Sequence, residues 1–269
     1  NTFNVPGASD NLTISGVISG SGGGFNKTGP GTLTLRGVNT YTGGTTISAG
    51  TLALRGSGTI GQPVTLAGGS LDTGGGPINY NLVLSGSNTF NTDPGLTTTI
   101  SGQLSGTGSL VATGGGTLYL SNATNSYQGG STAISSILQV DSDANLGNVS
   151  GGVTLNASTL KVLNSSTIAR PLQLQGSSAF DTNNNNQTIS GNISNVSGQT
   201  GALTLQGGGI VTLSGTNSFT GGTTLLGTSL IIDNASRIGS GTFTMSGSFP
   251  PSISGSTLTI TTTPMTISN

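Results

Sequence analysis

The sequence contains no cysteine, histidine, tryptophan or glutamate. Without cysteine there are no disulfides, no thiolate nucleophile and no zinc–thiolate site. Without histidine, the many serines have no imidazole beside them to activate a hydroxyl for nucleophilic attack. These absences remove the commonest routes to covalent hydrolysis and to transition-metal chemistry.

Charge is nearly absent as well, since the 269 residues include only 6 Lys and Arg and 7 Asp. A nucleic-acid partner requires a basic face, which so few cations do not supply, and we expect none. No run of 18 or more apolar residues occurs, so we expect no membrane insertion of this segment. The chain begins at Asn1 with no initiator methionine and no signal peptide, and we therefore expect a preceding segment to have been removed.

What the sequence has in quantity is glycine, with 48 residues, and short apolar triplets set among Thr, Ser and Asn. Good helix formers are too sparse, and too often interrupted by glycine, to sustain a 3.6-residue period. Triplets such as Leu33-Thr-Leu35, Leu52-Ala-Leu54 and Leu118-Tyr-Leu120 alternate apolar and polar residues, which is typical of strands with one buried face. Turn residues separate the triplets, so the pattern indicates an all-β protein with very short strands.

The spacing of the triplets selects among all-β folds. Leu12 and Leu33 are 21 residues apart, while Leu33, Leu52 and Leu71 follow at steps of 19. A solenoid coil of about 20 residues has short strands, small corner residues and the same inward row in every turn. The spacing predicts a right-handed parallel β-helix wound from a single chain, with about 13 coils. At about 4.8 Å per coil the rod is about 60–65 Å long.

A longer period lies over the coils. The segment Ile14–Gly20 recurs as Ile100–Gly106, 86 residues on, and as Ile189–Asn195, a further 89 residues on. We predict one continuous β-helix over residues 1–269, with tandem internal copies at approximately 1–87, 88–177 and 178–269. Three copies of about 90 residues then account for the whole chain.

Two strings carry a family resemblance. GPGTLTLRGVNTYTGGTTISAGTLALRGSGTIG at Gly29–Gly61 resembles the passenger-associated repeat of bacterial autotransporters, and so does AFDTNNNNQTISGNIS at Ala179–Ser194. The resemblance covers essentially all of the chain. It implies a β-helical passenger that is exported through the cell envelope and displayed outside a Gram-negative bacterium. It does not imply one activity, because function depends on sites carried by the fold.

Two residue types recur at a fixed corner of each copy, an aromatic residue and, two positions earlier, an asparagine. The aromatics are Tyr41, Tyr127 and Phe219, and the asparagines are Asn39, Asn125 and Asn217. As an exposed ladder the rings would stack on sugars, whereas buried beside the Gly-Gly pair that follows they would fill the corner. The asparagines would hold a ligand or cap the bend through their side chains. For both types the structural role is the favoured interpretation.

Acidic residues come together only at Asp141 and Asp143, which would point the same way if they lay in one strand. The pair is a weak candidate for a calcium site, since the further acidic ligands of known calcium loops are missing. A solvated strand end is the favoured interpretation. We find no other metal site, no cofactor site and no convergent acid, base and nucleophile. The sequence therefore predicts that the protein is not an enzyme.

A threonine-rich β-helix also raises the possibility of ice binding, which needs a flat threonine array at one position of successive coils. The outward residues of the recurring triplet are Thr34, Tyr119 and Thr212 in the three copies. A tyrosine in the middle of such an array would break its flatness. Ice binding is therefore disfavoured.

The two ends of the chain offer neither a capping helix nor a charge cluster, although the end coils of a β-helix expose unpaired backbone groups. The last segment, Pro264–Asn269, resembles two internal segments whose continuation matches Asn1–Phe3. Two alternatives stay open: a slice of a longer array, or a subunit that pairs head to tail into an extracellular filament. The candidate end-to-end contacts are Thr2, Phe3, Met265 and Ile267.

These observations favour a non-catalytic extracellular structural protein, a rigid surface fibre or stalk that supports adhesion or cell-surface display. The expected partners are copies of itself end to end, neighbouring repeats of a longer chain, and cell-surface glycans or matrix. The contrasting hypothesis is a carbohydrate-binding or carbohydrate-cleaving passenger. A groove that gathers Asp141, Asp143 and a basic residue would favour it.

Overall fold

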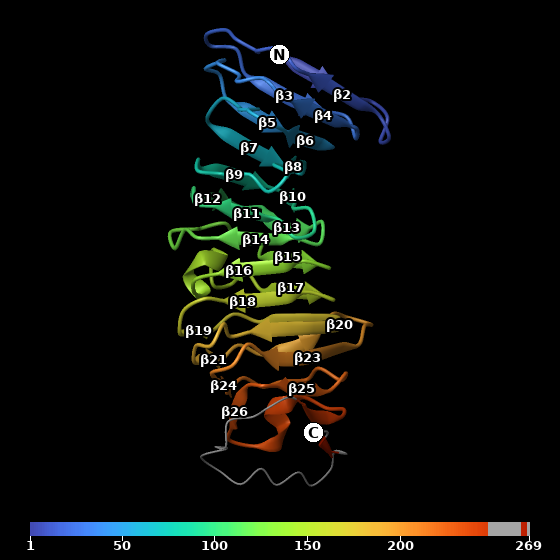
Figure 1. The fold of residues 1–269 in the computed structure, drawn as a ribbon, viewed down its shortest axis with the longest axis vertical. Helices are drawn as coiled ribbons and strands as arrows, with labels where there is room; N and C mark the ends of the chain where they lie inside the picture. Colours follow the sequence, from blue (N-terminus) through green and yellow to red (C-terminus); the bar gives the residue numbers. More distant parts are fainter. Residues whose placement is uncertain (247–264, 268–269) are drawn as a thin grey trace.

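The chain winds into a rod of stacked coils in the computed structural model, which describes residues 1–246 and 265–267 (Figure 1). Neighbouring strands pair in parallel from one coil to the next, and the coils form a β-solenoid of about 12 turns. Helix is limited, within the described residues, to the short 3-10 segments η1 (Asp143–Leu146) and η2 (Ala235–Ile238). The predicted all-β parallel solenoid is confirmed.

The strands stack in three faces that run along the rod. The first face begins with β1 (Thr2–Asn4), β3 (Phe25–Thr28), β5 (Thr45–Ile47), β7 (Val64–Ala67), β9 (Leu82–Ser85) and β12 (Leu104–Gly106). It then passes through a corner loop and η1 and resumes as β19 (Ser166–Ile168), β21 (Gln187–Ile189), β24 (Ile210–Leu213) and β26 (Ser229–Ile232). Hydrogen bonds carry the stacking across the gap, since Ser126 N donates to Leu104 O and Asn148 N donates to Tyr127 O.

The other two faces share the long strand β20. The second face consists of β2 (Asn11–Ile14), β4 (Thr32–Leu35), β6 (Thr51–Leu54), β8 (Ser70–Asp72), β10 (Ser87–Asn91), β13 (Ser109–Thr113), β15 (Ser131–Ile134), β17 (Val153–Asn156), the first half of β20 (Leu172–Asp181) and β22 (Ile193–Asn195). The third consists of β11 (Thr97–Ile100), β14 (Thr117–Leu120), β16 (Ile137–Val140), β18 (Thr159–Val162), the second half of β20, β23 (Gly201–Gln206), β25 (Thr223–Leu226), β27 (Phe243–Ser246) and β28 (Met265–Ile267).

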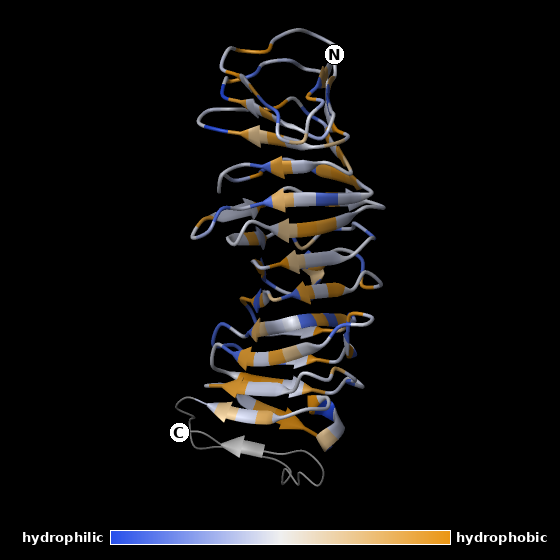
Figure 2. Cartoon of the chain, turned by 90° about the vertical axis from the view of Figure 1, so that its right-hand side faces the viewer, coloured by the Kyte–Doolittle hydropathy of each residue, from blue (hydrophilic) through white to orange (hydrophobic). Residues whose placement is uncertain are grey.

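The observed strand register pairs the residues that the predicted spacing places opposite one another. Leu12 lies opposite Leu33, Leu33 opposite Leu52, and Leu52 opposite Leu71. The last three of these side chains are at most 1% exposed, so each inward row buries itself against the rows above and below. Figure 2 shows the apolar residues gathered in the strands and the hydrophilic ones mostly in the corners. A coil has no core of its own, which is why the pattern must repeat.

Equivalent strands of the predicted copies lie on different faces. Phe3 is in β1 on the first face, Phe90 in β10 on the second, and Phe180 in β20 on the third. From β1 the chain completes four coils along the first face, through β3, β5 and β7 to β9, before β10 follows on the second. A copy therefore spans four full coils plus the step to the next face of the rod. Each copy starts one face further round the rod than the copy before it.

This rotation corrects the geometry assumed for the threonine array. Thr34 lies in β4 on the second face, Tyr119 in β14 on the third, and Thr212 in β24 on the first. These residues never stack at one position of successive coils. A residue that occurs once per copy faces three directions in turn, so no ladder arises from the copies themselves.

The Gly-Gly pairs mark places where adjacent coils touch through backbone. Gly130 and Gly222 have positive φ angles of 78° and 85°. A Cβ atom would lie 2.7 Å from Gly152 O at the first position and 2.4 Å from Thr242 O at the second. Any other residue would be strained in conformation and would also push the next coil away. These two corners therefore require glycine on two separate grounds.

Strands close the described part of the chain at both ends. β1 pairs with β3 and β28 pairs with β27, in both cases in parallel. Met265 and Ile267 lie in β28, and their side chains fall outside what the structure describes. No helix within residues 1–246 or 265–267 is long and apolar enough to span a membrane.

Candidate functional site

Asp141 and Asp143 do not share a strand face, contrary to expectation. β16 ends at Val140, and Asp143 begins η1. Asp141 Oδ1 accepts a hydrogen bond from Tyr119 OH at 2.8 Å, whereas Asp143 Oδ1 accepts one from Arg170 Nε at 2.7 Å. Within the described residues no three His, Cys, Asp or Glu side chains gather as a metal-ligand group.

Arg170 is buried and gathers a whole loop around its guanidinium. Its side chain is 1% exposed, and it donates seven hydrogen bonds, two of them to the Asp143 carboxylate. The remaining acceptors are the backbone carbonyls of Asp143, Leu146, Gly147, Asn148 and Gly151. Every donor of the guanidinium is thereby used inside the rod. The cluster therefore offers no basic group to a substrate, and it does not form the groove that would favour an enzyme.

The other ion pairs are isolated from one another. Arg55 Nη2 lies 2.6 Å from Asp72 Oδ2, and this pair raises the pKa of Arg55. Arg237 Nε lies 2.6 Å from Asp233 Oδ1, four residues away on the surface, and lowers the pKa of that carboxyl. Paired carboxylates flanking one bond, which glycoside cleavage requires, do not occur among these groups.

Lys27 is a buried cation that forms no ion pair within the described part of the chain. Its residue exposure is 0%, and Nζ donates to the backbone carbonyls of Thr28, Gly29 and Ala49 at 2.9, 2.8 and 3.2 Å. Burial lowers the pKa of Lys27. All three ammonium donors are used by a turn of the chain, so Lys27 is not poised as a base for a substrate.

The corner asparagines bridge three successive coils. Asn125 Oδ1 accepts from Leu104 N at 2.8 Å, and its Nδ2 donates to Asn145 O at 2.7 Å. The same pair of bonds joins Asn39 to Ile18 and Thr59, and Asn217 to Ile193 and Arg237. A side-chain amide has the donor and acceptor of a peptide unit, so it replaces a rung of the sheet where the corner interrupts pairing. Their structural role stays a prediction, which substitution tests.

The corner aromatics are inside the rod. Tyr41, Tyr127 and Phe219 are 5%, 0% and 0% exposed. Tyr127 OH shares a 2.6 Å hydrogen bond with Ser131 Oγ, and burial raises the pKa of this tyrosine to about 12. Tyr41 OH contacts Thr45 Oγ1 in the same way at 2.7 Å. The rings are not presented to a ligand, and they face three directions, so they form no sugar-stacking ladder.

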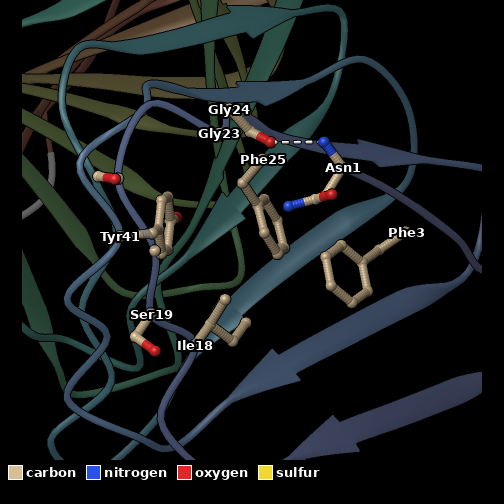
Figure 3. Close-up of a pocket in the computed structure, with 10 residues that line it drawn as sticks. Asn1, Phe3, Ile18, Ser19, Gly23, Gly24, Phe25 and Tyr41 are labelled. Atoms are coloured by element: carbon tan, nitrogen blue, oxygen red, sulfur yellow. Dashed lines mark hydrogen bonds between the residues drawn. The ribbon is translucent and has the colours of Figure 1, made fainter.

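One cavity of about 130 Å³ opens beside the first coil (Figure 3). It is lined by Phe3, Ile18, Phe25 and Tyr41 together with Asn1 and the glycine-rich turn at 19–24. Phe3 stacks on Phe25 with ring centroids 4.7 Å apart, and Phe25 stacks on Tyr41 at 5.6 Å. The lining continues the apolar interior and has no charged side chain, so we assign no ligand to it. Of the candidate end contacts, Phe3 thus packs inward, and Thr2 is exposed.

The sequence interpretation missed a row of polar side chains on the third face. Tyr119, Gln139, Lys161, Asp181 and Gln206 lie opposite one another in five successive coils. All five are half-buried, as outward residues of a sheet are. We call this set the third-face polar row. The signal in the sequence is a polar residue directly after a buried apolar one, recurring at steps of 20 to 25 residues.

Comparison with known proteins fits this geometry. Residues 25–54, 110–136 and 203–227 match the family described as Passenger-associated-transport-repeat. The matched segments open at equivalent residues, in β3, β13 and β23, and each contains one corner aromatic. The chain carries the passenger-associated-transport repeat in these three segments.

An autotransporter adhesin is also similar to the chain. The Adhesin BmaC autotransporter of Brucella suis biovar 1 (strain 1330) is 36% identical over 91% of this chain. The match covers 8% of that protein, so the chain spans less than one tenth of the relative's length. No solved structure gives a significant match.

Proposed function

We propose that this chain is a rigid, non-catalytic segment of an exported adhesin, displayed on the outer surface of a Gram-negative bacterium. The observation that carries the proposal is the 36% identity, over 91% of the chain, to an autotransporter adhesin. The family match supports the same export route. Because the match covers 8% of the relative, adhesion is proposed for the segment as one part of a larger passenger.

The architecture supports a rigid role. Three faces of parallel strands run along the rod, and the inward side chains of the coils form one contiguous apolar cluster. Each coil contacts its neighbours, so bending the rod would break backbone hydrogen bonds and open the core at the same place. Such a rod holds whatever it carries at a fixed distance from the cell.

The distribution of ionisable groups supports a non-catalytic role. Arg55, Arg170 and Arg237 are each committed to an aspartate, and Lys27 is committed to backbone carbonyls. General acid–base catalysis needs a titratable group within hydrogen-bond reach of a bound substrate. None of these four side chains meets that requirement.

The proposal is tested on cells of a non-adherent Gram-negative strain that display the passenger containing this chain. A short epitope is inserted beside Val149, which is 55% exposed in the loop after η1. We expect antibody labelling of intact cells, and an adherence to host epithelial cells that falls several-fold when residues 1–269 are deleted.

A replacement by an unrelated solenoid of equal coil number separates reach from recognition. Retained adherence would assign the segment to spacing, and lost adherence would assign it to contact with the host, both within the proposed role. An epitope hidden on intact cells, or an adherence unchanged by the deletion, would overturn the proposal.

A further inference from the structure

We propose that the third-face polar row binds an uncharged glycan chain that lies along the rod. The inference deepens the adhesive role proposed above, because it names a surface and a ligand class for it. The side chains of the row are not fixed by the repeat, and they do not take part in the apolar interior.

The row holds unused hydrogen-bonding groups. Within the described residues, the side chains of Gln139, Lys161 and Gln206 form no hydrogen bond or ion pair. Asp181 accepts one bond, from Asn183 N at 2.9 Å to Oδ1. Tyr119 is fixed by its 2.8 Å hydrogen bond to Asp141, which holds the ring in one orientation at the end of the row. Amide, ammonium and carboxylate groups together offer both donors and acceptors, which is what sugar hydroxyls need.

The geometry of the row suits an extended polymer. Five in-register residues at about 4.8 Å per coil make a line of about 19 Å. A second outward row runs beside it in the same strands, and its side chains are shorter: Thr117, Ile137, Thr159, Ala179 and Thr204. The long polar side chains stand higher than the short ones beside them and form a step. We expect the glycan to lie along this step with one edge against the third-face polar row.

Other ligand classes fit less well. A sulfated or nucleic polyanion is held by many cations, and this row has one ammonium, Lys161, with the carboxylate of Asp181 opposite it in the next strand. An added peptide strand needs unpaired backbone groups, whereas the strands of this face are paired on both sides. A neutral polyhydroxyl chain needs neither excess charge nor a free sheet edge.

The same positions in the other copies show that the fold does not demand these residues. The equivalents of the first four row positions, one copy earlier and on the second face, are Thr34, Ala53, Asp72 and Asn91. There Asp72 forms the ion pair with Arg55. In copy three the equivalents are Thr212 and Ile231, on the first face. Small or paired residues support the coils equally well, so the open polar row is a feature of one region.

Affinity electrophoresis of the purified chain in gels that contain dextran, galactomannan or xyloglucan tests the proposal, with heparin as the polyanion. We expect at least one neutral polysaccharide to retard the chain. The triple variant Gln139→Ala, Lys161→Ala, Gln206→Ala should weaken that retardation at least tenfold. The matched control is Gln173→Ala with Gln175→Ala, which removes two glutamines from the second face. Circular dichroism confirms that both variants are folded.

Retardation lost in the triple variant and kept in the control supports the proposal. Retardation by none of the neutral polysaccharides, by heparin alone, or equally by the triple variant overturns it. The outcome is independent of the adherence test. If the displayed chain supports adherence but no neutral polysaccharide binds, the glycan surface alone fails. If a polysaccharide binds but deletion leaves adherence unchanged, the adhesive function fails and the glycan surface stands.

Discussion

The corners at Tyr41 and Tyr127 share their tyrosine, asparagine and glycine residues, but the side chain that lies beneath each corner, two coils further along the rod, is different. Below the Tyr127 corner lies Arg170 with its seven hydrogen bonds. The equivalent residue below the Tyr41 corner is Tyr80, whose buried hydroxyl has no hydrogen-bond partner among the described residues. The guanidinium below the Tyr127 corner is fully paired, whereas the hydroxyl below the Tyr41 corner is not.

Loop length explains the difference. Nine residues separate β6 from β7 in copy one, at 55–63, whereas twelve separate β16 from β17 in copy two, at 141–152. The longer loop forms η1 and brings several backbone carbonyls inward, and buried carbonyls must be paired. A guanidinium supplies five donors and pairs them all. The repeat thus fixes the Asn, aromatic and glycine residues of a corner, while the loop dictates what lies beneath.

The largest expected effect comes from removing the Arg170 guanidinium. Arg170→Met leaves Asp143 and several carbonyls without donors, and breaking a buried pair in this way costs about 3–5 kcal/mol. Because each coil depends mainly on its neighbours, the loss should appear first as local opening. Hydrogen exchange should show amides at 143–151 exchanging much faster than in the parent chain.

Arg55→Met is the matched control for Arg170. Its ion pair with Asp72 is partly exposed, with side-chain exposures of 32% and 12%. A pair in contact with solvent contributes about 0–1 kcal/mol. Equal losses from the two variants would show that the loop around η1 does not rely on the buried guanidinium.

The corner asparagines are expected to give the next largest effect. Asn125→Ala leaves Leu104 N and Asn145 O unpaired in a buried corner, at a cost of about 1–3 kcal/mol for each unsatisfied group. Asn39→Ala should cost less, because its bond to Thr59 O is exposed and water replaces it. Urea unfolding of the two variants measures the difference, and identical midpoints would contradict the bridging role.

Asn125→Asp refines that test. Aspartate keeps an acceptor for Leu104 N but has no donor for Asn145 O, and it places a charge in a buried corner. We expect it to be no more stable than Asn125→Ala at neutral pH. A variant as stable as the parent would mean that the second bond does not contribute.

Most of the fold could be predicted from the coil spacing, because Leu12, Leu33 and Leu52 occupy the register that their separations predict. The fixed residues of the corner were also visible, since each recurs once per copy. What the spacing did not reveal is the rotation of the copies. Each copy is one face longer than four full coils, so each successive copy starts on a different face. This becomes visible only when the number of coils in one copy is known.

The candidate site was harder to predict for local reasons. Asp141 and Asp143 look like alternate strand positions, but the longer loop ends the strand at Val140. Arg170 precedes a proline, which is typical of a surface turn. In the structure its side chain is buried and donates to the carbonyls of the loop. The polar row is spread over about 90 residues, so its members become neighbours only in the folded coil stack.

A smaller effect is expected from the corner hydroxyls. Tyr127→Phe removes the partner of Ser131 Oγ and should cost about 1 kcal/mol. Tyr41→Phe should cost less, because Thr45 Oγ1 keeps its 2.8 Å bond to Gly61 O. Copy three already combines Phe219 with Thr223, whose Oγ1 donates to Ile238 O at 2.8 Å.

That natural combination offers a rescue. Tyr127→Phe with Ser131→Thr reproduces the copy-three pair inside copy two, and we expect it to recover most of the loss, as read from the urea midpoint. A double variant no more stable than Tyr127→Phe alone would show that the three corners are not interchangeable at this level.

The smallest effect at neutral pH has the opposite sign and comes from Tyr80, below the Tyr41 corner. Tyr80→Phe removes a buried hydroxyl that has no partner among the described residues, so we expect a gain of up to about 1 kcal/mol. Burial raises the pKa of Tyr80 above its ordinary value of about 10. Above that pH the unfolded chain loses this proton while the folded chain keeps it, so the parent loses stability as the pH rises. The advantage of Tyr80→Phe should therefore grow between pH 10 and 11 in paired urea titrations. A constant difference across that range would show that the hydroxyl reaches water and that the two corners are more alike than their side chains indicate.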